Sequence, residues 1–239
     1  MSRPGDGWRP AALPDDRLDA VAAELLDLLG LVDRALRRYG VVPEHEIVAG
    51  LREFAALPGA VAAGVVDTDP REPWHAAYEL AGRRSAVLAA AGPLARDGDR
   101  LAWSGAGRAA YETCWGPLSG QVAEALPATL AATASYGAHL AQWYAALRAA
   151  LVDFFLRYGT GPAAVGLRTA PIGAGGAGEL AAGGTAARAA ADLGAACFAA
   201  LRPVLRAGAA LRDDPPARPR HAGPAPSGHG GTAYEVDPG

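Results

Sequence analysis

Apolar residues recur at alternating three- and four-residue spacings in two long segments of the chain, 18–39 and 130–158. This spacing places one apolar stripe along each segment, as in helices that pack in coiled-coil fashion. Residues 43–57 and 73–102 also show helical spacing, and no strand-like alternation extends beyond a few residues. The pattern therefore predicts an all-α fold, an antiparallel helical bundle built around a long helical hairpin.

Prolines and glycines indicate where these helices are interrupted. Residues 60–73 are expected to form a loop, within which 61–66 is the one strand candidate and is interrupted by glycine. Kinks or breaks are expected at Pro93, at 116–117 and again at Pro127, because proline lacks the N–H that continues a helix.

Composition divides the chain into five parts. Residues 15–159 are expected to form the helical bundle, and 186–212 are expected to form one further helix. The Gly- and Ala-rich segment 160–185 reads as a flexible linker between them. Residues 1–14 and 213–239 are rich in Pro, Gly and Arg, so they lack the apolar side chains that offset ordering entropy and are predicted to be disordered tails.

Charge and composition exclude several classes of function. The net charge is −3, all basic side chains are arginine, and no basic block suggests a nucleic-acid partner. The two cysteines, Cys114 and Cys197, are interpreted as buried thiols. The uncharged run 125–147 is long enough to cross a membrane, but its polar and alanine-rich content favours a packed helix, so no membrane span is expected. The first residues lack the pattern of a Sec signal peptide.

No local motif predicts catalysis, a cofactor or a metal. Residues 173–178 fit G-x-G-x-x-G, but no buried strand precedes them, so the linker interpretation is preferred to a nucleotide site. No histidine lies four residues from another histidine or cysteine. Acid pairs fall in loops or helix ends, and neither Ser104 nor Ser119 fits a nucleophile motif. We therefore expect a protein that is not an enzyme and holds no cofactor.

The most specific segment surrounds Trp103 and Gly105. A predicted helix leads into Trp-x-Gly, and a second helix leaves it through alanines to Tyr111. Glycine permits the positive φ of a tight reversal, and tryptophan supplies a large plate that can hold two antiparallel helices together. Tyr111 and Trp115 are four residues apart and so share one helical face.

This arrangement resembles the WxG family of actinobacterial type VII (ESX) secretion substrates and secretion-associated proteins, over about residues 74–158. The resemblance implies a helical hairpin with its turn at Trp103 and Gly105. It also implies an interaction protein that packs against a helical partner or a second copy, and possible contact with the secretion ATPase or a chaperone. The helix-interface residues expected on the second helix are Tyr111, Trp115, Leu140, Tyr144, Leu147, Leu151 and Phe154.

Two alternatives remain open at this stage: a cytosolic helical scaffold or regulator that is not exported, and a WxG-type leader of a toxin or enzyme. Type VII systems recognise Tyr-x-x-x-Asp/Glu after the hairpin, and no tyrosine of this chain has an acid four residues later. Tyr234 and Asp237 come closest, with a spacing one residue short. The signal is either supplied by a partner or absent, so the expected location is secreted by a Sec-independent route or cytoplasmic.

Overall fold

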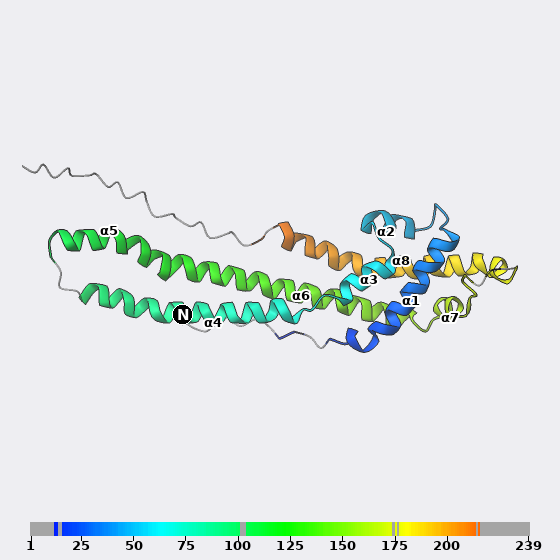
Figure 1. Ribbon diagram of the computed structural model, residues 1–239, viewed down its shortest axis with the longest axis horizontal. Helices are drawn as coiled ribbons and strands as arrows, with labels where there is room; N and C mark the ends of the chain where they lie inside the picture. The colour runs from blue at the N-terminus through cyan, green and yellow to red at the C-terminus, as the bar shows by residue number, and fades with distance from the viewer. Residues whose placement is uncertain are drawn as a thin grey trace, which may run out of the picture.

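The computed structural model describes residues 12–13, 16–100, 104–173, 175, 177–213 and 215. The regular elements among these residues are all helical, and no strand occurs within them, so the all-α prediction is confirmed (Figure 1). The helices are α1 (Leu18–Tyr39), α2 (Ile47–Phe54), α3 (Pro58–Val66), α4 (Arg71–Arg100), α5 (Ala106–Gly120), the π-helical segment η1 (Gln121–Ala125), α6 (Leu126–Tyr158), α7 (Pro162–Thr169) and α8 (Ala177–Asp213).

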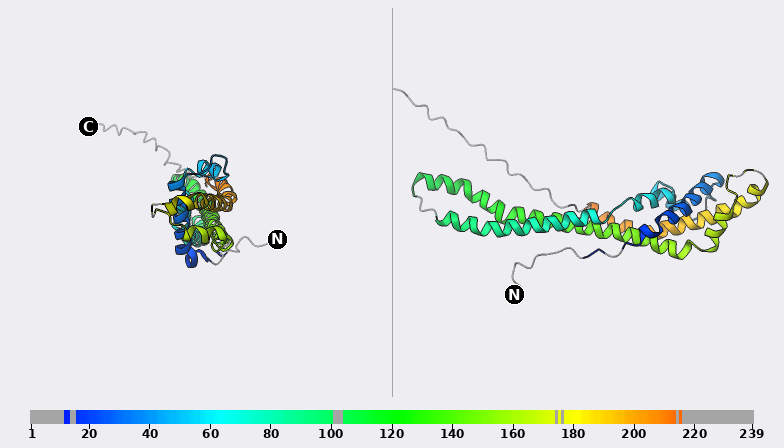
Figure 2. Two further views of the ribbon diagram at one scale, coloured as in Figure 1. Left: turned by 90° about the vertical axis from the view of Figure 1, so that its right-hand side faces the viewer. Right: turned by 60° about the horizontal axis from the view of Figure 1, so that its bottom comes forward.

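The molecule is elongated and has two parts. Helix α4 packs against η1 and α6 and runs in the opposite direction, α5 continues the second helix toward the far end, and this pair of helices extends away from the others (Figures 1 and 2). We call the described residues of 71–142 the arm. The base comprises α1, α2, α3, α7 and α8 together with residues 143–158 of α6.

Large apolar side chains form the core of the base. Helix α1 contributes its predicted stripe, which includes Leu25 and Val32, and both are fully buried. Phe154 of α6 and Phe198 of α8 are buried beside it. The ring of Phe54 on α2 stacks on Phe198 with a centroid distance of 4.5 Å. This continuous core fixes α1, α2, α6 and α8 against one another.

Two positions show how closely α8 packs on its neighbours. A Cβ added to Gly208 would lie 2.2 Å from Trp143 Cε2, so the indole of α6 lies directly against the backbone of α8. The indole N–H also donates a hydrogen bond of 2.9 Å to the carbonyl of Val204. The C-terminal end of α8 is therefore attached to α6 where the base meets the arm.

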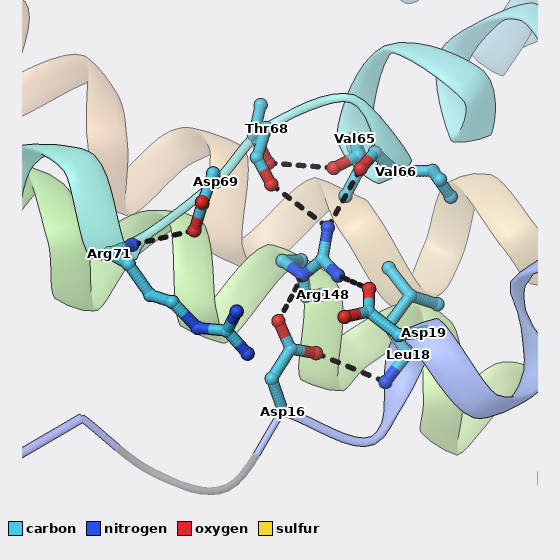
Figure 3. A network of polar contacts seen from close by, with 9 residues as sticks. All are labelled: Asp16, Leu18, Asp19, Val65, Val66, Thr68, Asp69, Arg71 and Arg148. Carbon is cyan, nitrogen blue, oxygen red and sulfur yellow. Dashed lines mark hydrogen bonds and ion pairs between the residues drawn. The ribbon is translucent and has the colours of Figure 1, made fainter.

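Arg148 joins four segments at the same boundary, as Figure 3 shows. Its side chain is only 5% exposed, and its Nε donates to an oxygen of Asp16 at 2.5 Å. Nη2 donates to the carboxylate of Asp19, and Nη1 donates to the carbonyls of Val66 and Thr68 at 2.7 and 2.9 Å. A buried guanidinium is tolerated when its donors are satisfied in this way. The network ties the start of α1 and the end of α3 to α6.

The prediction of a loop over 60–73 is wrong for the first half of that segment, because α3 occupies Pro58–Val66. Pro58 stands in the first turn of this helix, where the missing N–H costs nothing. Ala62 and Val65 are buried against the base core, and this packing stabilises a short Gly- and Ala-rich helix that has little helical signal of its own. The strand candidate within this segment is therefore helical.

The expected interruptions at prolines do not break the helices at the first two places. Pro93 lies inside α4, and 116–117 lie inside α5 without ending it. Near the third place, Pro127, the helix is irregular: the N–H of Leu126 bonds to the carbonyl of Gln121 in a π-helical turn. A widened turn of this kind accommodates a proline that cannot donate to the preceding turn.

The structure replaces the linker expected over 160–185 with two helical segments. Helix α7 buries Ala164 and Leu167 in the base, and α8 begins at Ala177, before the expected start at 186. Arg168 donates a hydrogen bond of 2.7 Å to the carbonyl of Gly159, which closes the end of α6. Alanine and leucine on one helical face provide the contacts that composition alone did not indicate.

The expected tails over 1–14 and 213–239 lie almost wholly outside the described residues. Among the described residues, one helical segment, Ala182–Asp213, is long and apolar enough to cross a membrane, and 47–54 with 58–93 passes the same test only as a bent pair. The single segment belongs to α8, which packs along α1 and α6 and buries Leu193 and Leu201. This packing buries part of its apolar surface.

Candidate partner-binding arm

Helix α4 ends and α5 begins at the free end of the arm (Figure 1). Gly105 adopts a φ of +79°, a conformation that side-chain-bearing residues rarely adopt. Its carbonyl accepts a hydrogen bond of 3.3 Å from the N–H of Ala109, which starts α5. The expected role of Gly105 as the turn glycine matches this geometry. Trp103 lies outside the described residues.

Near the base, the two helices of the arm approach closely through small residues. A Cβ added to Gly137 on α6 would lie 3.3 Å from the Cβ of Ala77 on α4 and 3.1 Å from the carbonyl oxygen of Pro73. Any larger side chain at position 137 would push the helices apart. This contact positions the arm relative to the base.

The arm has no large side chain in its interior. Its buried members, among side chains that the structure describes, share one feature: they are alanine or proline. They are Ala77, Pro127, Ala134, Ala138 and Ala141. Hydrophobic stabilisation scales with the apolar area removed from water. These small side chains therefore contribute much less to stability than the buried leucines and phenylalanines of the base.

Large apolar side chains follow one another along α5 and η1 instead, at spacings of three or four residues. We call Tyr111, Trp115, Leu118, Val122 and Leu126 the apolar stripe of the arm. The rings of Tyr111 and Trp115 stack with centroids 5.8 Å apart. Leu118 is 48% exposed and Leu126 is 43% exposed, so α4 covers this stripe only in part.

Helix α4 presents further apolar surface on the same arm. Tyr78 and Leu88 are both exposed, and the ring of Tyr78 stacks on Trp74 at a centroid distance of 5.8 Å. The sequence analysis did not single out Leu88, Leu118 or Leu126. The three-to-four spacing that continues from Tyr111 was the available signal for the last two. Their exposure depends on which helices cover them, which spacing does not encode.

Two ion pairs of the arm are local, and one further arginine of α4 has a buried donor without an acceptor. Arg108 pairs with Glu112 at 2.6 Å, and Arg83 pairs with Glu79 at 3.7 Å, each across one helical turn. The Nε of Arg84 is removed from solvent and has no hydrogen-bond acceptor in the part of the chain that the structure describes. Leaving a buried donor unsatisfied is unfavourable. Arg84 therefore marks a position on the arm where an added carboxylate or carbonyl would be stabilising.

The other expected interface residues divide between the two parts. Leu140 of the arm and Tyr144 of the base are half-buried. Leu147, Leu151 and Phe154 are buried within the base, where their own chain covers them. Only Tyr111 and Trp115 belong to the incompletely covered stripe of the arm.

The perturbed titratable groups lie in the base, away from the arm. Burial raises the pKa of Asp33, although its carboxylate accepts a hydrogen bond of 2.9 Å from the N–H of Gly59. Burial and the nearby Asp33 raise the pKa of the Cys197 thiol to about 12, so this thiol is protonated and unreactive at neutral pH. The side chain of Cys114 lies outside the description. Among the described residues, no group of three His, Cys, Asp or Glu side chains is placed to hold a metal ion.

The Gly-rich segment 173–178 follows a helix. Gly173 and Gly175 have positive φ angles, and the element before them is α7. The dinucleotide fingerprint needs a strand at that place, so its structural context is missing here. Comparison of the chain with protein-family models, curated proteins and solved structures finds no match.

Proposed function

We propose that this chain is a non-enzymatic interaction protein, a WxG-type substrate or associated factor of a type VII secretion system, and that its arm is the surface that binds a helical partner. The observation that carries the proposal is the incomplete core of the arm. Large apolar side chains line its two helices, yet only alanine and proline are buried between them among the described side chains.

Packing further helices against a two-helix arm of this kind would stabilise it. Packing one or two helices on the apolar stripe would bury the half of Leu118 and of Leu126 that is still exposed, which contributes about half of the ~1.5–3 kcal/mol for burying a whole side chain of this size. A partner carboxylate beside the guanidinium of Arg84 would form a charge-assisted ion pair with it. We therefore expect the partner to be a short amphipathic helix or hairpin, or a second copy, with an acidic residue beside its apolar face.

The position of Gly105 supports the type of protein proposed. Gly105 makes the reversal at the tip of the arm, with one long helix on each side, as the resemblance to WxG proteins implies. The proposed route of export is therefore Sec-independent.

The test is export from a type VII-secreting actinobacterium that carries the gene. The tagged chain is measured in culture filtrate and in lysate, with the secretion ATPase intact and deleted. We expect signal in the filtrate that disappears in the deletion strain. Signal confined to the lysate of both strains would contradict the secretion proposal and leave a cytosolic helical scaffold.

Matched variants separate the arm from exposed apolar surface in general. The double variant Leu118→Ser/Leu126→Ser removes apolar side chains from the arm, whereas Leu156→Ser changes a residue of the base that is 66% exposed. We expect the double variant to lose export or partner binding and the control to retain both. Equal behaviour of the two variants would remove the arm from the proposal.

A further inference from the structure

A second surface feature lies in the base, at the connection between α1 and α2. Gly40 adopts a φ of +74° after the last turn of α1, and this conformation turns the chain away from the helix. Residues 40–46 then pass alongside α8 before α2 begins (Figure 1). A groove of about 700 Å³ lies between this connection and α8, which is within the usual size range of small-molecule sites.

The connection is attached to α8 on both sides of the groove. On one side the ring of Tyr39 rests on the backbone of α8, because a Cβ added to Gly183 would lie 3.1 Å from Tyr39 Cε1. On the other side His45 Nε2 and Asp192 Oδ1 are 3.0 Å apart. His45 Nδ1 accepts the N–H of Ile47 at 3.2 Å, so Nε2 carries the proton and donates to Asp192. These two contacts place the connection against α8 at both ends of the groove.

The floor of the groove is shaped by small residues of α8. Gly184, Ala187 and Ala191 face the connection and leave the space that longer side chains would fill. Val41 and Val42 form the opposite wall, and Val42 is exposed. The walls therefore offer apolar contact area to a ligand of modest width.

The charge that lines the described part of the groove is positive. Arg188 lies between the two attachment points on α8, is exposed, and makes no hydrogen bond or ion pair with any other described residue. No acidic side chain is among the residues that line the groove in the described part of the chain. The nearby carboxylate of Asp192 is engaged by His45. The groove thus combines apolar walls with one positive charge that has no counter-ion among the described side chains.

We propose that this groove binds a small amphiphile with one acidic group, whose apolar body lies against Val41, Val42 and Ala187 and whose acid pairs with Arg188. The planar guanidinium fork of arginine suits a carboxylate or a phosphate. The site is separate from the arm, and its occupancy does not depend on the function proposed for the arm.

Isothermal titration calorimetry of the full chain with octanoate tests the proposal. We expect saturable binding of one octanoate per chain. Propionate has the charge without the apolar body, and 1-octanol has the body without the charge, so both should bind at least about tenfold more weakly. Octyl phosphate identifies the preferred acidic group: tighter binding than octanoate would assign an alkyl phosphate, and weaker binding would assign a carboxylate.

Three variants locate the binding. Arg188→Gln should weaken octanoate binding about tenfold, and Ala187→Leu should block it by filling the floor of the groove. Arg212→Gln changes an arginine near the end of the same helix and should leave the affinity unchanged. Helicity measured by circular dichroism verifies that each variant is folded. No saturable octanoate binding, or equal affinity in Arg188→Gln and wild type, would overturn the proposal.

Discussion

In the base, leucine and phenylalanine side chains from several helices are fully buried, whereas the described side chains buried in the arm are alanine and proline. Both parts are built from long helices with apolar residues at helical spacing. They differ in how many neighbours each helix has: α6 contacts α1, α3 and α8 within the base, but within the arm it is accompanied by α4.

This difference shows that one helix, α6, can complete a core at one end and belong to an incompletely covered arm at the other. Residues 143–158 of α6 complete a core within their own chain, and the preceding residues of the same helix belong to an arm whose apolar stripe is only half covered. Stability is therefore expected to reside in the base, and the capacity to bind another helix is expected to reside in the arm. The following substitutions test that division.

The largest loss of stability is expected at the boundary. Arg148→Ala leaves the carboxylates of Asp16 and Asp19 and two carbonyls without their donor, so we expect the free energy of unfolding to fall by about 3–5 kcal/mol. Arg83→Ala removes an exposed ion pair of the arm, and its effect should stay below about 0.5 kcal/mol. Urea unfolding followed by circular dichroism compares them, and similar losses in both variants would contradict the division.

A pair of leucines gives the next largest contrast. Leu151→Ala opens a cavity in the core of the base and should cost about 2–5 kcal/mol. Leu118→Ala shortens a half-exposed side chain of the arm and should change stability by less than about 0.5 kcal/mol. The same unfolding experiment measures both. If Leu118→Ala destabilised the free chain as much as Leu151→Ala, the stripe would already be covered within the chain.

Replacing a glycine by alanine is expected to change stability in opposite directions in the base and in the arm. Gly208→Ala places a Cβ against the indole of Trp143, so it should destabilise by about 1–3 kcal/mol and speed hydrogen exchange near the end of α8. Gly82→Ala on the arm meets no atom within 4 Å and should stabilise α4 by up to about 1 kcal/mol. Thermal unfolding and hydrogen exchange test this pair, and a destabilising Gly82→Ala would show that a neighbour covers that face.

The smallest effect is a pH dependence in the base. Because burial raises the folded-state pKa of Asp33 above its unfolded value, the folded state holds this proton more tightly. The resulting stabilisation is complete below the unfolded pKa and is lost as pH rises through the folded pKa. Asp33→Asn keeps an acceptor for the N–H of Gly59 and does not titrate. Its stability relative to wild type should therefore increase with pH in urea titrations, and a constant difference would contradict the burial argument.

The long helices of the fold could be predicted from the sequence, whereas the short ones could not. The stripe over 18–39 coincides with α1, because a regular spacing of leucine and valine specifies both the helix and its buried face. Helices α3 and α7 are rich in Gly and Ala and owe their stability to buried contacts of Ala62 and Leu167. Such contacts depend on segments distant in sequence, so local composition suggested a loop and a linker instead.

Within the candidate site, the sequence indicated a turn glycine, but it did not indicate which apolar side chains stay exposed. Gly105 was recognisable because a reversal between helices favours glycine, and its positive φ fits that expectation. Helical spacing places Leu118 and Leu151 in equivalent apolar stripes. Only the tertiary arrangement reveals that the base covers Leu151 while Leu118 stays half exposed. The groove beside Arg188 likewise depends on two contacts between residues far apart in the chain.

Site-specific photo-crosslinking inside cells that express the full chain tests the central claim most directly. A photoreactive amino acid is placed at Leu118 on the arm, or at Leu156 on the base as the control. We predict one discrete adduct from position 118, either with a small helical protein or with a second copy of the chain, and no matching adduct from position 156. No adduct from position 118, or the same adducts from both positions, would contradict the assignment of the arm as the partner-binding surface.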